Sequence, residues 1–259
     1  MSLLVPVFAL LGLFVGSFLN VCIDRLPRGQ SIIINPPSHC STCNRKLSIL
    51  DLVPLFSYLW LRGRCRYCQA PIPLRLTIVE GITGFLFVSL YWQFGLGLEL
   101  GISLIYTSLL VIIFVIDLEN RLVLDKITYP AMILALAFSF FWPGLGVISA
   151  LGGVPLGRVL SSLAGGALGF VAYALPLVLS RGGMGWGDVK LAALVGLMTG
   201  FPSVIVAVLL AWITGGLVAG VLLAFRIKGP KDPIPSATFL ATSAMVTMLW
   251  GQAIWQWYL

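Results

Sequence analysis

Residues 182 to 191 of the chain read Gly-Gly-Met-Gly-Trp-Gly-Asp-Val-Lys-Leu. The glycine-rich turn places one acid, Asp188, directly before an apolar run that continues to Val195. A carboxylate at the start of an apolar helix is costly to bury in a membrane, so its presence calls for an explanation. Two interpretations are open: a solvated loop acid assisted by Lys190, or one half of a pair of catalytic aspartates.

The composition on both sides of this stretch is typical of a helical membrane protein. Hydrophobic residues make up 59% of the 259 residues and charged residues only 10%, whereas soluble domains carry about 25% charged residues. Apolar runs of roughly 16 to 24 residues recur along the chain, which is long enough to cross a hydrocarbon core. The first run, Leu3 to Leu19, lacks a basic segment before it and a small-residue cleavage site. We therefore expect a retained helix there and not a signal peptide.

We expect an all-α polytopic membrane protein with about eight transmembrane helices. The predicted spans are 3–20, 76–94, 101–117, 127–142, 157–180, 188–200, 203–225 and 236–256. The segment 21–75 between the first two spans is too polar to cross, and it holds eight of the sixteen basic residues. The chain is thus expected to divide into a first helix (1–20), a polar segment (21–75) and a seven-helix domain (76–259).

The basic residues predict the orientation of these helices. Basic loops stay in the cytoplasm, so the segment 21–75 is expected inside and the N-terminus outside. The later inner loops also hold Lys and Arg, whereas the outer loops near 95–100, 143–156 and 200–202 contain none. A basic patch also occurs in nucleic-acid-binding proteins. Cytoplasmic retention already explains this one, so we expect a lipid bilayer and no nucleic acid as partner.

Two C-x-x-C pairs lie in the polar segment: Cys40 with Cys43, and Cys65 with Cys68. Each pair can present two thiolates to one ion, and two pairs complete a tetrahedral site, which suits Zn²⁺. The cytoplasm disfavours the alternative of disulfides. A site of four cysteines has no open position, so the sequence predicts a structural zinc ion. The fifth cysteine, Cys22, is expected to be a small apolar filler, and His39 a solvated neighbour.

The predicted topology brings Asp117 and Asp188 to the same face, because one ends an inward-running helix and the other begins an outward-running helix. Two neighbouring carboxyl groups favour a state in which one is ionised and the other protonated. The ionised group can deprotonate a water molecule, and the protonated group can donate to the peptide carbonyl and then to the leaving amine. Asp24, Glu119 and Asp125 are competing acids. Glu119 and Asp125 lie in a loop with Arg121 and Lys126, so these two are expected to be solvated or paired.

Two further patterns concern the helices themselves. Asn20 and Asp24 are four residues apart and share a face if the first helix continues past residue 20. The repeats Gly165-x-x-x-Gly169 and Gly216-x-x-x-Gly220 predict close helix packing, with hinges as the alternative.

The chain resembles the type IV prepilin peptidases, a family of membrane aspartyl proteases with a G-x-G-D motif. The resemblance covers nearly the whole chain and depends on five groups of residues. They are Gly-Ser-Phe-Leu-Asn-Val at 16–21 with Arg-Leu-Pro at 25–27, the two C-x-x-C pairs, Val79-Glu80, Ile116-Asp117 with Asp125, and Gly-Met-Gly-Trp-Gly-Asp-Val-Lys-Leu at 183–191. Leu124 departs from the family, which usually has proline there.

The resemblance implies a location, two reactions and their residues. The family's catalytic acids correspond to Asp117 and Asp188, at the cytoplasmic face of the bacterial inner membrane. They cleave the basic leader of prepilins and pseudopilins after a glycine, and many members then methylate the new N-terminal amine with S-adenosylmethionine. By analogy, methylation is expected in the zinc-binding segment, with Asn20, Asp24 and Glu80. The sequence indicates neither which pilins are cut nor an oligomeric state.

Two rival classes remain open. One is a different protease of the G-x-G-D type, against which the C-x-x-C pairs argue. The other is a non-enzymatic transporter or assembly protein with a structural zinc knuckle. An acid pair in a proton relay is expected at mid-membrane depth, whereas these two acids are predicted at the face.

Overall fold

The structure is a computed structural model that describes residues 4–32, 38–40, 42–141, 155–179, 185–227, 229 and 235–258. Its regular elements there are helices, with two isolated bridges between extended segments. The chain forms two compact units, Met1–Leu100 and Gly101–Leu259. The division predicted from the sequence at residues 20 and 75 stays a prediction.

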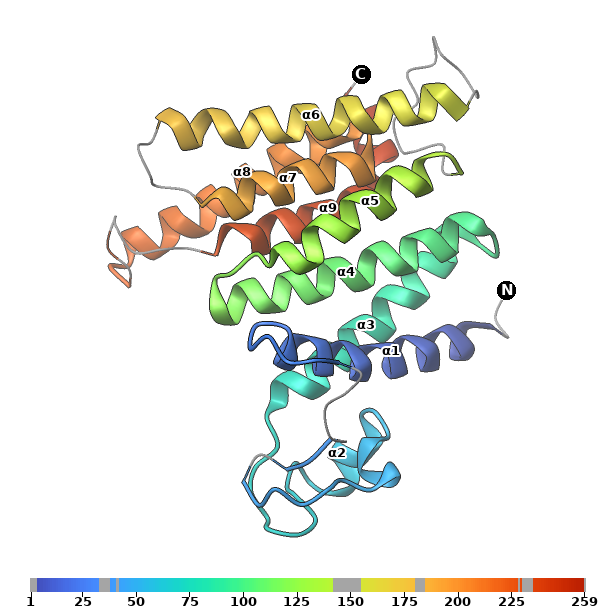
Figure 1. The fold of residues 1–259 in the computed structure, drawn as a ribbon, viewed down its shortest axis with the longest axis vertical. Helices are drawn as coiled ribbons and strands as arrows, with labels where there is room; N and C mark the ends of the chain where they lie inside the picture. The colour runs from blue at the N-terminus through green and yellow to red at the C-terminus, as the bar shows by residue number, and fades with distance from the viewer. Residues whose placement is uncertain are drawn as a thin grey trace. The chain divides into compact units, whose positions relative to one another are not determined.

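The first unit is built on a crossing of α1 (Val5–Arg25) and α3 (Leu74–Phe94), shown in Figure 1. The backbones approach closely because glycine occupies the contact: a Cβ added at Gly12 would lie 2.7 Å from the Cα of Gly84. α1 continues beyond its predicted end to Arg25, so Asn20 and Asp24 lie on one face. The chain between the two helices contains only a short 3₁₀ helix, η2 (Ile49–Leu52), and the five-residue α2 (Phe56–Trp60).

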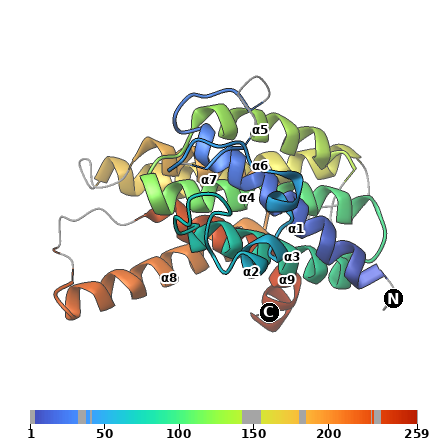
Figure 2. The ribbon, with the colours of Figure 1, turned by 90° about the horizontal axis from the view of Figure 1, so that it is seen from below.

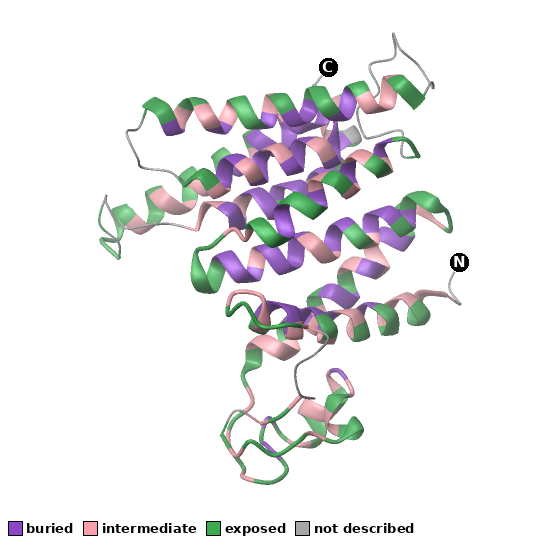
Figure 3. Cartoon of the chain, viewed as in Figure 1, coloured by how far each residue is buried: buried purple, intermediate pink, exposed green. Residues whose placement is uncertain are grey.

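The second unit consists of longer helices packed around α7. Its helices are α4 (Leu98–Asn120), α5 (Asp125–Ser139), α6 (Pro155–Leu179), α7 (Trp186–Thr199), α8 (Ser203–Ala224) and α9 (Ser236–Tyr258). α7 packs against α5, α6, α8 and α9, and the views in Figures 1 and 2 show it among them. Val189, Leu191 and Ala192 are all 0% exposed. A helix that is apolar all round belongs inside a bundle, and Figure 3 shows α7 largely in the colour of buried residues.

The Gly165–Gly169 prediction is confirmed, whereas the Gly216–Gly220 prediction is wrong. A Cβ at Gly165 would meet the backbone of Gly196 on α7, so glycine sets the α6–α7 distance. At Gly216 and Gly220 nothing described lies within 4 Å of an added Cβ. The spacing of small residues on α8 is therefore present without a close neighbour among the described residues.

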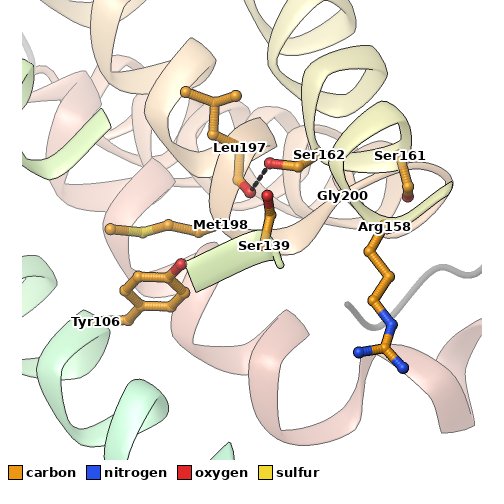
Figure 4. Close-up of a pocket in the computed structure, with 8 residues that line it drawn as sticks. All are labelled: Tyr106, Ser139, Arg158, Ser161, Ser162, Leu197, Met198 and Gly200. Atoms are coloured by element: carbon orange, nitrogen blue, oxygen red, sulfur yellow. Dashed lines mark hydrogen bonds between the residues drawn. The ribbon is translucent and has the colours of Figure 1, made fainter. Parts of the chain in front are cut away.

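A small cavity lies at the C-terminal end of α7, opposite the end that carries Asp188. Figure 4 shows Ser162 of α6 donating its hydroxyl to the carbonyl of Leu197, 2.7 Å away, beside Ser139 and Arg158. The volume of about 10 Å³ corresponds to roughly one water molecule. This hydrogen bond and the glycine contacts fix α7 against α6 along its length.

A helix lies at each of the eight positions predicted for membrane spans. Five described helices are long and apolar enough to cross a membrane: α1, α3, α4, α6 and α8. α5 and α7 have 15 and 14 residues, fewer than the roughly 20 that a straight span needs. Eight crossings and their orientation therefore stay predictions. Residues 143–154 of the predicted outer loop and residues 182–184 of the glycine-rich turn lie outside the described residues.

Candidate active site and metal centre

Asp188 is buried in the first turn of α7, with 8% of its surface exposed. The positive end of the helix dipole favours a carboxylate at this position. Lys190 does not pair with it, because its ammonium group lies 2.8 Å from Asp125. These observations contradict the interpretation of Asp188 as a solvated loop acid.

Asp117 is buried near the C-terminal end of α4, with 4% of its surface exposed. The backbone N–H and the hydroxyl of Thr238 both donate to its Oδ2 atom, at 2.7 and 2.8 Å. Two donors on one carboxylate oxygen offset much of the cost of removing that oxygen from water. Asp117 and Asp188 are close enough for their charges to interact, as the predicted topology requires.

The start of α9 (Ser236, Ala237 and Thr238) holds both acids. Ser236 donates its hydroxyl to the carboxyl group of Asp188, and the backbone N–H of Ala237 donates to Asp117 beside Thr238. Because the first N–H groups of a helix lack partners within it, a helix start is a natural site for an anion. Ser236 and Thr238 were not among the residues predicted from the sequence. Their signal was the order Pro-Ser-x-Thr at a predicted helix start, which is too common to identify a partner 121 residues away.

The competing acids lie elsewhere, and the prediction that Glu119 and Asp125 are solvated or paired is confirmed. Asp125 pairs with Lys190, and Asp24 pairs with Arg75 at 2.7 Å. Glu119 lies on the exposed last turn of α4. Among the described acids of the second unit, Asp117 and Asp188 are thus the two that the fold both buries and brings together.

Gly187 allows α7 to begin close to the loop that follows α4. A Cβ added at Gly187 would lie 2.9 Å from the Cβ of Val123, closer than real side chains approach. At Gly185 the nearest atom is the Oδ2 of Asp188 at 3.7 Å, an ordinary contact. The two glycines of the G-x-G-D motif therefore differ: Gly187 is required by a close approach, and Gly185 is not.

The four cysteines of the C-x-x-C pairs gather in one cluster, with their sulfurs all within 4.8 Å of one another. The sulfurs of Cys40 and Cys68, one from each pair, are 3.8 Å apart. Four sulfurs at about 2.3 Å from a tetrahedral zinc ion lie roughly 3.8 Å from each other. The cluster therefore fits a metal ion of this kind without a change of fold.

The two C-x-x-C pairs have the same backbone structure. Asn44 donates to the carbonyl of Cys40 as Gln69 donates to that of Cys65, at 2.9 and 3.0 Å. Cys40 and Cys65 in turn donate to the carbonyls five residues on. The residue after each pair, Asn44 or Gln69, has a positive φ, 53° or 60°. Each pair thus forms the same tight turn, which presents two sulfurs from one side.

The surroundings shift the pKa values of the Cys40 and Cys68 thiols in opposite directions. Backbone amides, first that of Cys43 and then that of Thr42, stabilise the Cys40 thiolate and lower its pKa to about 6. The Ala70 amide favours the Cys68 thiolate, but desolvation and the neighbouring sulfurs outweigh it, and they raise its pKa to about 11. Neighbouring thiolates repel each other, and a divalent cation removes that repulsion when it displaces the protons.

The remaining candidates behave as predicted. Cys22 is buried in α1 with 3% exposure and lies outside the cluster. His39 is exposed and is not one of the clustered ligands.

The chain is similar to known proteins over nearly its whole length. Residues 10–94 match the model of the bacterial peptidase A24 N-terminal domain, and residues 104–220 match that of the type IV leader peptidase family. The chain is 34% identical to a prepilin leader peptidase/N-methyltransferase of Aeromonas hydrophila, over 96% of this chain and 92% of that protein. Proteins of the same name from Pseudomonas aeruginosa and Bacillus subtilis are 31% and 29% identical, over 96% and 99% of this chain and 91% and 98% of their own lengths. No solved structure matches the chain. The chain belongs to the type IV leader peptidase family.

Proposed function

We propose that the protein removes the leader of type IV prepilins and pseudopilins after a glycine, with Asp117 and Asp188 as its catalytic pair. One observation carries this proposal: the fold buries two carboxyl groups together and holds each by donors from the start of α9. The relatives named as prepilin leader peptidases support the substrate class.

The pair needs neither a metal ion nor a nucleophilic side chain for peptide hydrolysis. One ionised carboxyl group deprotonates a water molecule, which attacks the scissile carbonyl. The protonated partner donates to the carbonyl oxygen and then to the leaving amine. The two groups share one proton and titrate as a unit. Donors from Thr238 and Ser236 hold both groups in place.

The four-cysteine cluster holds a structural zinc ion in this proposal. Cys40, Cys43, Cys65 and Cys68 fill all four positions of a tetrahedral ion. The segment between α1 and α3 has few buried side chains of its own, so metal binding supplies much of its folding free energy.

The protein acts in the bacterial inner membrane, with eight crossings, an outer N-terminus and the acid pair at the cytoplasmic face. Five candidate spans and the distribution of basic residues support this placement. A prepilin can then lie in the bilayer beside the enzyme with its basic leader in the cytoplasm.

A second reaction follows cleavage: methylation of the new N-terminal amine by S-adenosylmethionine. The names of the relatives, which include N-methyltransferase, support it. Both reactions are tested by reconstituting the protein in vesicles with a prepilin and measuring the product by mass spectrometry. We expect loss of the leader, and a gain of one methyl group only when S-adenosylmethionine is present. An intact prepilin would refute the peptidase proposal.

Thr238→Val should lower the rate of leader cleavage about tenfold without unfolding the protein. Valine keeps the shape and the backbone N–H but removes the hydroxyl that donates to Asp117. Hydrogen bonds to charged groups contribute about 1.5–3 kcal/mol. The measurement is the initial cleavage rate of a purified prepilin. The control is Thr247→Val, because Thr247 is buried in α9 and its hydroxyl bonds only within that helix. Equal rates for the two variants would contradict the role of Thr238.

Cys40→Ser and Cys65→Ser should each abolish stoichiometric zinc binding. Serine replaces a thiolate by a hydroxyl, which is a poor zinc ligand and leaves the tetrahedral set incomplete. Elemental analysis of the purified protein measures the zinc content. Cys22→Ala is the matched control, because Cys22 is buried in α1 away from the cluster. One zinc ion per chain in the two serine variants would exclude the four-cysteine site.

A further inference from the structure

Glycines set the register in which α6 and α7 pack side by side (Figure 1). A Cβ added at Gly165 would meet the carbonyl oxygen of Gly196, and one added at Gly169 would meet that of Ala192. From the first contact to the second, the position advances by four residues on α6 and goes back by four residues on α7. Residues four apart lie on the same face of a helix. The contact between the two helices therefore leads toward the first turn of α7, which carries Asp188.

Tyr173 is the residue of α6 that lies one further step along this contact. Four residues separate it from Gly169, as four residues separate Asp188 from Ala192. Its side chain is buried, with 3% of its surface exposed. Its phenol group interacts electrostatically with the carboxyl group of Asp188, as the register requires. The acid pair and the donors described above come from α4, α7 and α9, and Tyr173 adds a group from α6.

Trp212 of α8 determines which hydrogen bonds the phenol can make. The centroid of its ring lies 6.1 Å from that of Tyr173, with the two rings tilted by 40°. Its indole group also hydrogen-bonds to the hydroxyl of Tyr173. An indole N–H can only donate, so the oxygen of Tyr173 accepts this bond. The hydrogen of the hydroxyl is left for another acceptor.

The carboxyl group of Asp188 suits this hydrogen. A buried hydroxyl that donates to nothing is costly, and a hydrogen bond to a carboxylate is roughly twice as strong as one between neutral groups. Tyrosine ordinarily keeps its proton up to about pH 10, so the donor is present at neutral pH.

We propose that Tyr173 is a positioning residue of the peptidase site: its hydroxyl, held by Trp212, donates to the carboxyl group of Asp188. The proposal rests on the catalytic pair proposed above. Ser236 donates to the same carboxyl group from α9. One donor leaves a carboxyl group free to turn about its own bond, whereas donors from two helices fix it in the orientation that proton transfer needs.

Tyr173→Phe should lower kcat for leader cleavage about tenfold and leave KM within about twofold. Phenylalanine keeps the ring between α6 and α8 but removes the hydroxyl, so it preserves packing and substrate binding while Asp188 loses a donor. A loss in kcat without a rise in KM is expected when the lost group acts on the reacting step and not on binding. The measurement is steady-state cleavage of a purified prepilin by the full-length protein in vesicles.

Tyr106→Phe is the matched control. Tyr106 is also a buried tyrosine of the second unit, with 2% of its surface exposed. It lies at the small cavity near the C-terminal end of α7 (Figure 4), and its hydroxyl lies 3.5 Å from the carbonyl oxygen of Ala135. We expect this variant to keep kcat within about twofold of the unsubstituted protein, because it loses the same group away from the acid pair.

The pH profile of kcat separates a hydrogen bond to Asp188 from a loss of packing. Asp117 of α4 is the acid that acts on Asp188, and Lys190, on the same helix as Asp188, pairs with Asp125 of α5. α8 and α9 contain no charged residue, and the single one of α6 lies near the other end of that helix. Loss of a donor disfavours every state in which Asp188 is ionised. The profile of Tyr173→Phe should therefore move toward higher pH, while that of the control stays in place.

Trp212→Phe tests how the hydroxyl is held. Phenylalanine keeps an aromatic ring on α8 but lacks the N–H that donates to Tyr173, so kcat should fall about threefold. The double variant Tyr173→Phe/Trp212→Phe should cleave at the rate of Tyr173→Phe alone, because Trp212 acts only through the hydroxyl. Losses that multiply in the double variant would contradict the link between the two residues.

The outcomes distinguish this proposal from the one on which it rests. If Asp188→Asn cleaves normally, the catalytic pair fails and Tyr173 has no acid to position. If Asp188→Asn is inactive while Tyr173→Phe matches Tyr106→Phe in kcat and pH profile, the pair stands and the role of Tyr173 is refuted. A loss of kcat in Tyr173→Phe with an unmoved pH profile and a lowered midpoint of thermal unfolding would also refute it, because that result identifies a packing residue.

Discussion

Asp117→Asn and Asp188→Asn should each lower the rate of leader cleavage by about 10²- to 10⁴-fold, the contribution usual for a general acid or base. Asparagine has the shape of aspartate, and its amide oxygen can still accept the two bonds that Thr238 donates at position 117. The substitution therefore removes the proton chemistry and preserves the packing. Cleavage of a prepilin by purified, reconstituted protein measures the effect.

Asp125→Asn is the control for this pair. Asp125 also lies near the start of a helix in the second unit, but it is about half exposed and pairs with Lys190. Exposed ion pairs contribute about 0–1 kcal/mol to stability, so we expect a change in rate of less than about fivefold. Leader cleavage that survives either Asp117→Asn or Asp188→Asn would refute the catalytic pair.

Gly187→Val should lower cleavage at least 100-fold and leave one zinc ion bound. The first carbon of the new side chain would lie 2.9 Å from the Cβ of Val123, so α7 or the loop after α4 must move. Overpacking of this kind costs roughly 1–3 kcal/mol. A displacement near 1 Å at a reacting group can cost about 100-fold in rate, and Asp188 is the next residue along the helix. Cleavage rate and zinc content are measured on one preparation.

The same substitution at Gly216 separates this contact from a general effect of valine in a helix. Gly216 lies inside α8 of the same unit, and nothing described lies within 4 Å of an added Cβ. We expect Gly216→Val to cleave within about twofold of the unsubstituted protein. An active Gly187→Val enzyme would mean that the glycine only starts a helix and that the approach of Val123 is not required.

The positions of the helices and of the acid pair were predictable because both depend on strong, local signals. Long apolar runs identify helices, and basic loops predict which end of each helix faces the cytoplasm. Asp117 and Asp188 are then predicted at the same membrane face, because each lies at the cytoplasmic end of its helix. The cysteine cluster was predictable for a similar reason: two C-x-x-C pairs suffice for a tetrahedral set. The sequence predicted a shared face for Asn20 and Asp24 only if the first helix continued past residue 20. It did not predict the extension of α1 to Arg25, because it does not show where a helix that leaves the membrane ends.

The groups that hold the acids were not predictable, because they depend on contacts between distant parts of the chain. Thr238 and Ser236 are ordinary residues for a helix start, and only the fold brings them to Asp117 and Asp188. The cavity of about 490 Å³ in the first unit was not predictable, because its lining comes from α1, α3 and the segment between them. The Gly216 pattern misled because spacing shows that small residues share a face, but not that another helix lies against it.

The start of α9 has a consequence for the synthesis of the enzyme. Asp117 and Asp188 lie well before Ser236 in the chain, so they leave the ribosome first. An unfinished protein carries both acids without the N–H and hydroxyl groups that hold them. With Asp117 and Asp188 as the proposed catalytic pair, we expect hydrolytic activity to begin only when the last helix has been translated and packs in the bundle. A chain that ends before residue 236 should therefore show no leader cleavage.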